Sequence, residues 1–299
     1  MNRSNVNQGQ ALLEETHEEV PSDGNYRPSS VVLFLLLHLG CVAVFFVPFR
    51  WSYVALAAGL YFLRMFGVTA GYHRYFSHRS YKLARVPQFL IGFLAETSGQ
   101  KGVLWWAAHH REHHQYSDTP QDVHSPVQKG FWWAHMGWIM SSDYDEHDSN
   151  LIRDFSKFPE LRWLDRYYLV PPAILGAAVF LIGGLPAFVW GFVVSTVFLY
   201  HGTFTINSLC HVWGNRRFDT HDDSRNNFWL ALITMGEGWH NNHHKFMYAC
   251  RQGLRWWEVD FTFYLLKALS WVGITRELRN PRLVEEQDEA PKELAATAR

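Results

Sequence analysis

Charge is missing from long parts of this sequence. No Asp, Glu, Lys or Arg occurs from residue 167 to residue 215. One bilayer-spanning helix needs about 20 apolar residues, so this run is about twice as long as a single crossing requires. Two crossings fit if the chain turns at residues 183–186, which read Gly-Gly-Leu-Pro. Buried helices of soluble proteins rarely give uncharged runs of this length, so we interpret the chain as an integral membrane protein.

Other absences narrow the class of function. The 27 Lys and Arg residues nearly balance the 28 Asp and Glu residues and form no basic block, so nucleic-acid binding is not expected. The three cysteines, Cys41, Cys210 and Cys250, form no CxxC pair, and we expect no disulfide framework. Residues 1–28 lack the apolar core of a signal peptide and predict a disordered cytoplasmic tail.

The apolar runs predict an all-α membrane protein with four spans in two hairpins. We expect the spans at about residues 31–49, 52–70, 169–182 and 186–207. Two hairpins would return both termini and the segment between them to one side of the membrane. Lys and Arg concentrate on that side, while Arg50 is essentially the only charge opposite, so we assign that side to the cytoplasm. Arg64, inside the second span, is expected to snorkel toward the headgroups.

Two shorter apolar segments complete the predicted membrane domain. Residues 86–95 and 261–274 are too short or too interrupted to span, and we expect interfacial or re-entrant helices there. The integral membrane domain would then cover residues 29–276, followed by a loosely ordered tail at residues 277–299.

Nine of the seventeen histidines fall into four groups, all on the predicted cytoplasmic side. The groups are His73 and His78; His110, His113 and His114; His211; and His240, His243 and His244. Residues three and four apart share a helix face, so each HxxHH group can direct its imidazoles at one small volume. Nine imidazoles exceed the three or four ligands of one zinc ion, so we predict two metal ions. Imidazole suits iron, zinc, copper and nickel, and the ligand type leaves the metal open.

The other histidines are not assigned to this site. His109 would point about 100° away from His110 on a helix and is left out of the ligand set. We interpret the rest as ordinary polar side chains near the membrane surface: His17, His38, His124, His135, His147, His201 and His221.

At these histidines the chain resembles the membrane fatty acid desaturases, within them the Δ9 acyl group that includes the stearoyl-CoA desaturases. The resemblance covers roughly residues 30–275 and is carried by the segments GVTAGYHRYFSHRSYK (67–82), HREHH (110–114), NSLCH (207–211) and EGWHNNHH (237–244). It implies four transmembrane helices carrying a cytosolic helical cap. It also implies a di-iron centre held by the nine histidines, with a water held by Asn207.

The reaction implied by the resemblance is O₂-dependent removal of two hydrogens from a saturated acyl chain, leaving a cis double bond. An unactivated methylene offers neither an acidic proton nor an electrophile, so a metal cofactor must carry the difficult step. Glu237 and Asn241 are further candidates, as side chains that orient the imidazoles.

The resemblance leaves the acyl carrier open between CoA, acyl-ACP and a lipid ester. The family's animal members, which bind acyl-CoA, have Arg and Asp where this chain has Ala108 and His109, and they tend to have two basic residues where it has Gln128 and Lys129. The sequence also lacks the His-Pro-Gly-Gly signature of a fused cytochrome b5. A separate electron donor is therefore expected, either a ferredoxin or a cytochrome b5-like protein with its reductase.

Two alternative functions fit part of the pattern. A membrane di-iron hydroxylase would use the same ligands and differ only in its product. A non-catalytic metal sensor or transporter would need polar or charged residues within the spans. The first, third and fourth spans contain no Asp, Glu, Lys or Arg, which disfavours the non-catalytic alternative.

Overall fold

The computed structural model describes residues 25–281, and most of these are helical. The predicted tails at residues 1–28 and 277–299 lie mainly outside the described residues and stay predictions. The longer helices are α1 (Pro28–Gly40), α2 (Trp51–Phe66), α3 (Arg85–Glu96), α4 (Val103–Tyr116), α8 (Val170–Ala187), α9 (Ser195–Asn207) and α13 (Phe261–Trp271).

Short elements connect the long helices. The short α-helices are α5 (Pro126–Lys129), α6 (Arg153–Ser156), α7 (Pro159–Arg166), α10 (Leu209–Val212), α11 (Phe228–Ile233) and α12 (His240–Lys245). The π-helical stretches are η2 (Gly67–Ser77), η3 (Trp133–Gly137) and η7 (Phe188–Val194). The 3₁₀ turns are η1 (Cys41–Phe46), η4 (Trp138–Met140), η5 (Ser142–Tyr144) and η6 (Ser149–Ile152). Strands β1 (Lys82–Leu83) and β2 (Thr275–Arg276) pair antiparallel, with Lys82 opposite Arg276.

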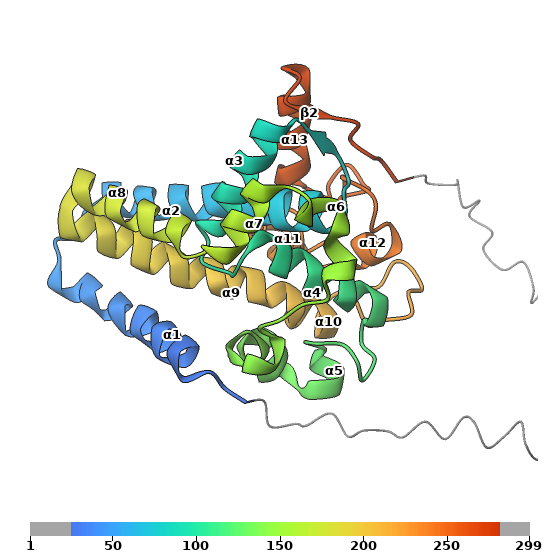
Figure 1. Ribbon diagram of the computed structural model, residues 1–299, viewed down its shortest axis with the longest axis horizontal. Helices are drawn as coiled ribbons and strands as arrows, with labels where there is room; N and C mark the ends of the chain where they lie inside the picture. The colour runs from blue at the N-terminus through green and yellow to red at the C-terminus, as the bar shows by residue number, and fades with distance from the viewer. Residues whose placement is uncertain (1–24, 282–299) are drawn as a thin grey trace, which may run out of the picture.

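Three helical stretches of the described chain are long and apolar enough to cross a membrane. They are Pro28–Phe46, Trp51–Ser77 and Val170–Val212. The third is 43 residues long, and Gly184 leaves the helical conformation inside it with φ at 67°. The chain reverses there, so that α8 and the segment leading into α9 lie side by side (Figure 1). The predicted turn at residues 183–186 is confirmed, whereas the count of four crossings is not settled by length and composition.

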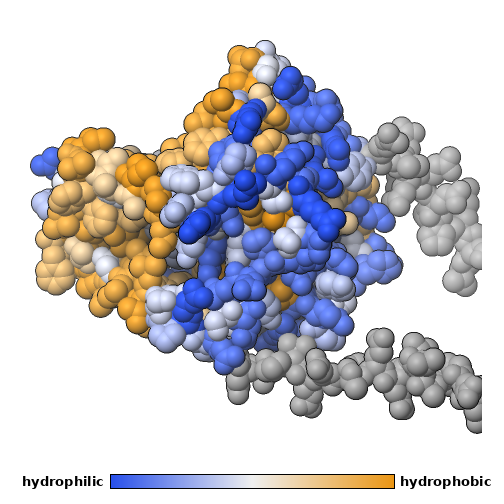
Figure 2. Space-filling view, viewed as in Figure 1, coloured by the Kyte–Doolittle hydropathy of each residue, from blue (hydrophilic) through white to orange (hydrophobic). Residues whose placement is uncertain are grey.

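Helices α1, α2, α8 and α9 extend to one end of the molecule, whereas α3, α4, α13 and most of the short elements gather in a cap at the other end (Figure 1). The end formed by α1, α2, α8 and α9 has an apolar surface, and the surface of the cap is largely polar (Figure 2). Phe45, Phe46, Leu181 and Ile182, near the tips of the two hairpins, are 83%, 83%, 81% and 88% exposed. An apolar surface of this extent is typical of contact with lipid.

Arg64 faces inward, and the prediction that it snorkels is wrong. Its side chain is fully buried in α2 and donates hydrogen bonds to the hydroxyl groups of Ser195 and Thr196 at the start of α9. Its guanidinium also lies over the Phe192 ring, with 5.8 Å from Cζ to the ring centroid. These neighbours take the place of water, so the charge does not need to reach the headgroups.

The cap core joins η2, α3, α4 and α7. The segments predicted as interfacial helices form α3 and α13, and Val86 and Leu90 of α3 remain exposed. The backbones of η2 and α3 pack directly together at Gly67, where a Cβ atom would lie 2.9 Å from the Ala95 nitrogen. This close contact fixes η2, which carries the first histidine group, against the cap.

Candidate metal centre

The π-helical geometry of η2 explains why two histidines five residues apart face the same way. The His78 N–H donates to the His73 carbonyl at 3.2 Å, which is the i to i+5 hydrogen bond of a π-helix. In an α-helix the two side chains would point about 140° apart. Here their ring centroids are 4.8 Å apart.

Helix α4 carries the second group and is held at its N-terminus by a carboxylate. The N–H groups of Leu104 and Trp105 both donate to Asp165 at 2.9 Å. Gly102 permits this contact, because a Cβ atom there would lie 2.2 Å from the Asp165 carboxylate oxygen. The capped helix thereby presents His110 and its neighbours from a fixed position.

All nine predicted ligands come together, and they divide into two groups. The first group is His73, His78, His110, His114 and His243, and the second is His113, His211, His240 and His244. Within each group the ligand nitrogens all lie within 4.8 Å of one another. The second sequence motif is therefore split, since His113 faces one group while His110 and His114 face the other.

The nitrogen positions in the first group suit a shared cation. Nε2 of His110 lies 2.9 Å from Nε2 of His78 and 3.0 Å from Nε2 of His114. Nε2 of His243 lies 3.0 Å from Nε2 of both His73 and His114. Ligands at right angles about a metal, with bonds of about 2.1 Å, would stand about 3.0 Å apart. The donor set therefore fits a metal ion.

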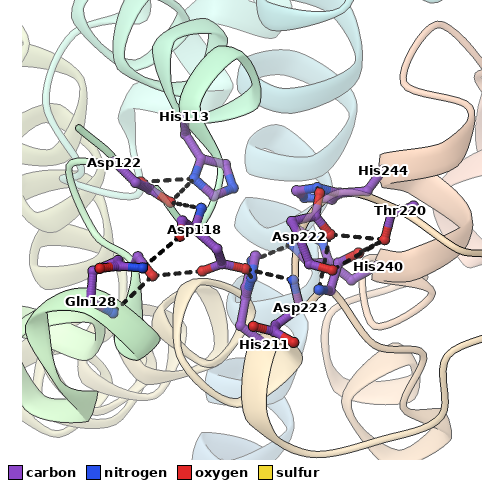
Figure 3. A network of polar contacts seen from close by, with 12 residues as sticks. His113, Asp118, Asp122, Gln128, His211, Thr220, Asp222, Asp223, His240 and His244 are labelled. Atoms are coloured by element: carbon purple, nitrogen blue, oxygen red, sulfur yellow. Dashed lines mark hydrogen bonds and ion pairs between the residues drawn. The ribbon is translucent and has the colours of Figure 1, made fainter. Parts of the chain in front are cut away.

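Carboxylates fix the tautomer of four of these rings, and Figure 3 shows the three that involve Asp118, Asp122 and Asp222. Nδ1 of His113 donates to Asp122 at 3.0 Å, Nδ1 of His211 to Asp118 at 2.8 Å and Nδ1 of His244 to Asp222 at 2.6 Å. Nδ1 of His73 lies 2.6 Å from Oε2 of Glu237. Once Nδ1 carries the proton, Nε2 presents a lone pair toward the group, as metal ligation requires.

Two buried Nε2 atoms in the second group have no hydrogen-bond partner, those of His113 and His244. Buried polar atoms are normally paired, because an unpaired one costs about 1–3 kcal/mol. The same atoms belong to the group whose nitrogens converge within 4.8 Å. A bound metal ion would satisfy them.

Burial keeps most of these imidazoles neutral. Burial, followed by the neighbouring rings, lowers the pKa well below the ordinary value in six of them: His78, His110, His114, His240, His243 and His244. Burial raises the pKa of Glu237, but Arg74 and His73 outweigh it and lower that pKa to about 2. Neutral imidazoles beside ionised carboxylates are the protonation states that metal binding needs.

Of the further candidates Glu237, Asn241 and Asn207, only Glu237 forms an ion pair with one of the nine imidazoles. Glu237 contacts His73, and it also pairs with the buried Arg74 at 3.0 Å. Asn241 instead accepts the N–H groups of Arg217 and Phe218 at 2.8 Å, and so braces the loop that leads to Asp222. Asn207 ends α9 and lines a cavity beside the centre. His109 donates from Nδ1 to the Trp105 carbonyl at 3.0 Å and lies outside both groups.

Sequence reasoning missed three carboxylates. Asp118 and Asp122 follow shortly after His114, and metal-ligating imidazoles usually donate their other N–H to such groups. The short spacing from His114 could therefore have predicted Asp118 and Asp122 as partners of the imidazoles. Nothing in the sequence distinguishes Asp222 from the adjacent Asp223, which contacts Asp118 only through its backbone N–H.

A cavity of about 230 Å³ reaches the centre from the side of α1. Phe34 and Leu37 of α1 form one wall, and Trp106 and His110 of α4 lie at the metal centre. Asn207, the last residue of α9, also lines the cavity. An apolar space that is bordered by a predicted metal ligand is suited to hold a hydrocarbon chain beside it.

The family model for fatty acid desaturases matches residues 49–270. The chain belongs to this family, which confirms the resemblance seen in the histidine motifs. It is an oxidoreductase of the acyl desaturase class.

Curated relatives cover most of the chain. The palmitoyl-monogalactosyldiacylglycerol delta-7 desaturase of Arabidopsis thaliana is 37% identical over 262 residues, which is 86% of this chain and 70% of that protein. The sn-1 stearoyl-lipid 9-desaturase of Synechocystis is 36% identical over 269 residues, 88% of this chain and 84% of the relative. An acyl-CoA 5-desaturase of Anemone leveillei is 36% identical over 261 residues, 86% of this chain and 81% of the relative.

Proposed function

We propose that this chain introduces a cis double bond, at the Δ9 position, into a saturated acyl chain of a membrane lipid. The observation that carries the proposal is the convergence of two histidine groups, one of which borders an apolar cavity through His110. The relative from Synechocystis has the name of a stearoyl-lipid 9-desaturase, which supports both the position and the carrier.

Two iron ions would be held by the nine histidines and would supply the O₂ chemistry needed to remove hydrogen from a methylene. The chain contributes their ligands and the carboxylates that set the tautomers. The cavity wall excludes water and holds one pair of acyl carbons beside His110 and Asn207. In this proposal Asn207 holds a water at the site.

The charges at the α1 side of the cavity favour a lipid ester over CoA. Arg27 and Lys101 both line the cavity, and both pair with Asp145, Lys101 at 3.1 Å. Paired cations offer less attraction to the phosphates of CoA or to an acidic carrier protein. A neutral lipid ester needs no such attraction.

We further propose that α8 and the segment from η7 to α9 cross the membrane separately. That arrangement makes four crossings and places both termini and the metal centre on the cytoplasmic side. The donor of electrons would then be a cytoplasmic protein, either a ferredoxin or a cytochrome b5-like protein with its reductase.

The test is acyl profiling of a host with and without the chain. We expect new Δ9 monounsaturated chains under air, none without O₂, and about two irons per purified chain. His110→Ala and His243→Ala should lose iron and activity together, because each removes a ligand. His147→Ala, outside both groups, is the matched control.

Two further results would contradict the proposal. Hydroxylated products instead of olefins would assign the chain to the hydroxylases. Label appearing first in the acyl-CoA pool, and only later in intact lipids, would make CoA the carrier.

A further inference from the structure

A second cleft, of about 340 Å³, lies in the cap where α12 begins. Figure 1 shows α12 in the cap, away from the end of the molecule that α1, α2, α8 and α9 form. The charged residues that line the cleft are three arginines and one carboxylate: Arg216, Arg217, Arg255 and Glu258. An excess of positive charge around a concave surface attracts partners of negative charge.

The three arginines differ in whether their charge is already paired. Arg217 pairs with the buried Glu258, with 3.1 Å between Nη1 and Oε2. Arg216 pairs with Asp223 at 3.3 Å. Arg255 is exposed, and its guanidinium forms no ion pair or hydrogen bond with any of residues 25–281. Arg255 is therefore the cation in this cleft that is free to pair with a partner.

Two exposed tryptophans follow Arg255. Trp256 is 90% exposed, and Trp257, which lines the cleft, is 39% exposed. Burying an aromatic side chain is favourable, so a ring left this open gains most when another surface covers it. Tryptophan and arginine are also enriched among the residues that dominate the binding energy of protein–protein interfaces. The cleft and its edge thus have the composition of a protein-docking surface.

The cleft leads toward the second histidine group. The Trp257 ring lies 5.5 Å, centroid to centroid, from the ring of the buried Trp239. Trp239 directly precedes His240, whose Nε2 lies 3.1 Å from Nε2 of His211 within that group. The acyl cavity instead borders the first group, through His110. A partner in the cleft would therefore reach the centre from a different surface than the acyl chain.

We propose that this cleft docks an acidic electron-carrier protein, with Arg255 and Trp256 as the main contacts. The inference rests on the proposed function, because only a reaction that consumes electrons needs such a partner. One O₂, two acyl hydrogens, two electrons and two protons from solvent give one double bond and two waters. Each carrier holds a one-electron centre, so two carriers are oxidised in succession in every turnover.

The experiment uses the full-length, iron-loaded chain in proteoliposomes with two probes, reduced ferredoxin and the reduced soluble domain of cytochrome b5. The KM for each carrier is measured for the wild type, Arg255→Glu and Trp256→Ala. For the carrier with the lower wild-type KM, we expect both variants to raise KM at least fivefold at low salt. The effect of Arg255→Glu should shrink as the salt concentration rises, because salt screens exposed charges. Arg276→Glu and Trp132→Ala, which change exposed residues outside the cleft, are the matched controls.

A second measurement separates docking from catalysis. The enzyme is reduced chemically, freed of the reductant and exposed to air, so that one turnover proceeds without a carrier. Both variants should then form as much product as the wild type, with unchanged iron content and melting temperature. Direct binding of the oxidised carrier should still weaken at least fivefold in both.

Four results would overturn the docking site. The first is an unchanged KM, or a KM that the controls raise equally. A loss of product after chemical reduction would instead give the two residues a structural role. A KM effect confined to vesicles of anionic lipid would assign the cleft to lipid headgroups. A wild type that forms product after chemical reduction but accepts neither carrier would overturn docking alone, whereas one that forms no product in either assay would overturn the proposed function as well.

Discussion

Asp222 accepts a hydrogen bond from Nδ1 of His244 at 2.6 Å, while the adjacent Asp223 pairs with Arg216 at the surface, 3.3 Å away. The two neighbours thus differ in whether they touch a predicted metal ligand. Asp222→Asn can present an amide N–H to Nδ1, which would move the ring proton to Nε2 and block ligation. We expect a 10- to 100-fold loss of iron affinity or activity. Asp223→Asn should lower the iron affinity and the activity by less than twofold. Equal losses in the two variants would show that Asp222 does not fix the tautomer of His244.

Glu237 should matter both for metal binding and for stability. Glu237→Gln removes the charge that faces His73 and the buried Arg74. Arg74 keeps its second partner, Asp260, at 2.9 Å, so we expect the fold to survive with a stability loss of about 1–3 kcal/mol. Iron content and melting temperature measure the two effects. Glu277→Gln, which changes an exposed pair with Lys82, is the control, and an unchanged iron content in Glu237→Gln would remove it from the site.

Glu96 should make the fold less stable as the pH rises. Burial raises the pKa of this carboxyl to about 8, from an ordinary value of 4.5. The folded state therefore keeps a proton that the unfolded chain releases above pH 4.5. The free energy of unfolding falls as the pH rises from 4.5 toward 8. At about 1.4 kcal/mol per pKa unit, the loss is on the order of 5 kcal/mol.

Glu96→Gln tests this pH dependence, because an amide mimics the protonated carboxyl and can still accept the Val103 N–H. Its melting temperature should change less between pH 5 and pH 8 than that of the wild type. The exposed Glu146→Gln should leave the wild-type slope in place. A Glu96→Gln slope equal to wild type would show that Glu96 ionises normally in the folded protein.

The cavity wall at α1 should set the length of the acyl chain that the enzyme accepts. Leu37 lines the cavity, whereas its neighbour Leu36 is 59% exposed on the outside of the helix. Leu37→Trp would fill part of the cavity, and we expect products shifted toward shorter chains in the acyl profile. Leu36→Trp should leave the profile unchanged. An unchanged profile in Leu37→Trp would place the acyl chain elsewhere.

The sequence was most informative where a local pattern decides the structure. The uncharged runs located the long helices, and Gly184 turns the chain where the Gly-Gly-Leu-Pro segment predicts. The convergence of the nine histidines was also predictable, because imidazoles at helical spacing on one side of a membrane have few other uses. Their division into two groups was not, since His113 and His114 are neighbours that face different groups.

The failures all concern contacts between distant segments. Arg64 was expected at the headgroups, but Ser195 and Thr196 on another helix accept its hydrogen bonds. His38 and His201 each have the features of an isolated side chain in the sequence, and only packing of α1 on α9 brings them together. A local sequence pattern cannot predict which distant residue a side chain contacts.

The π-helical stretch η2 makes the first histidine pair depend on chain length as well as on residue type. A π-helical turn differs from an α-helical one by a single additional residue in the loop closed by each hydrogen bond. Deleting one residue between His73 and His78 would leave both imidazoles in the sequence and let the helix return to its common form. The pair would then be four residues apart and still share a face, but the rest of η2 would be displaced by one residue relative to α3, which packs against it. The spacing of this pair and the packing of the cap therefore depend on the same number of residues. We expect η2 to tolerate substitutions better than insertions or deletions.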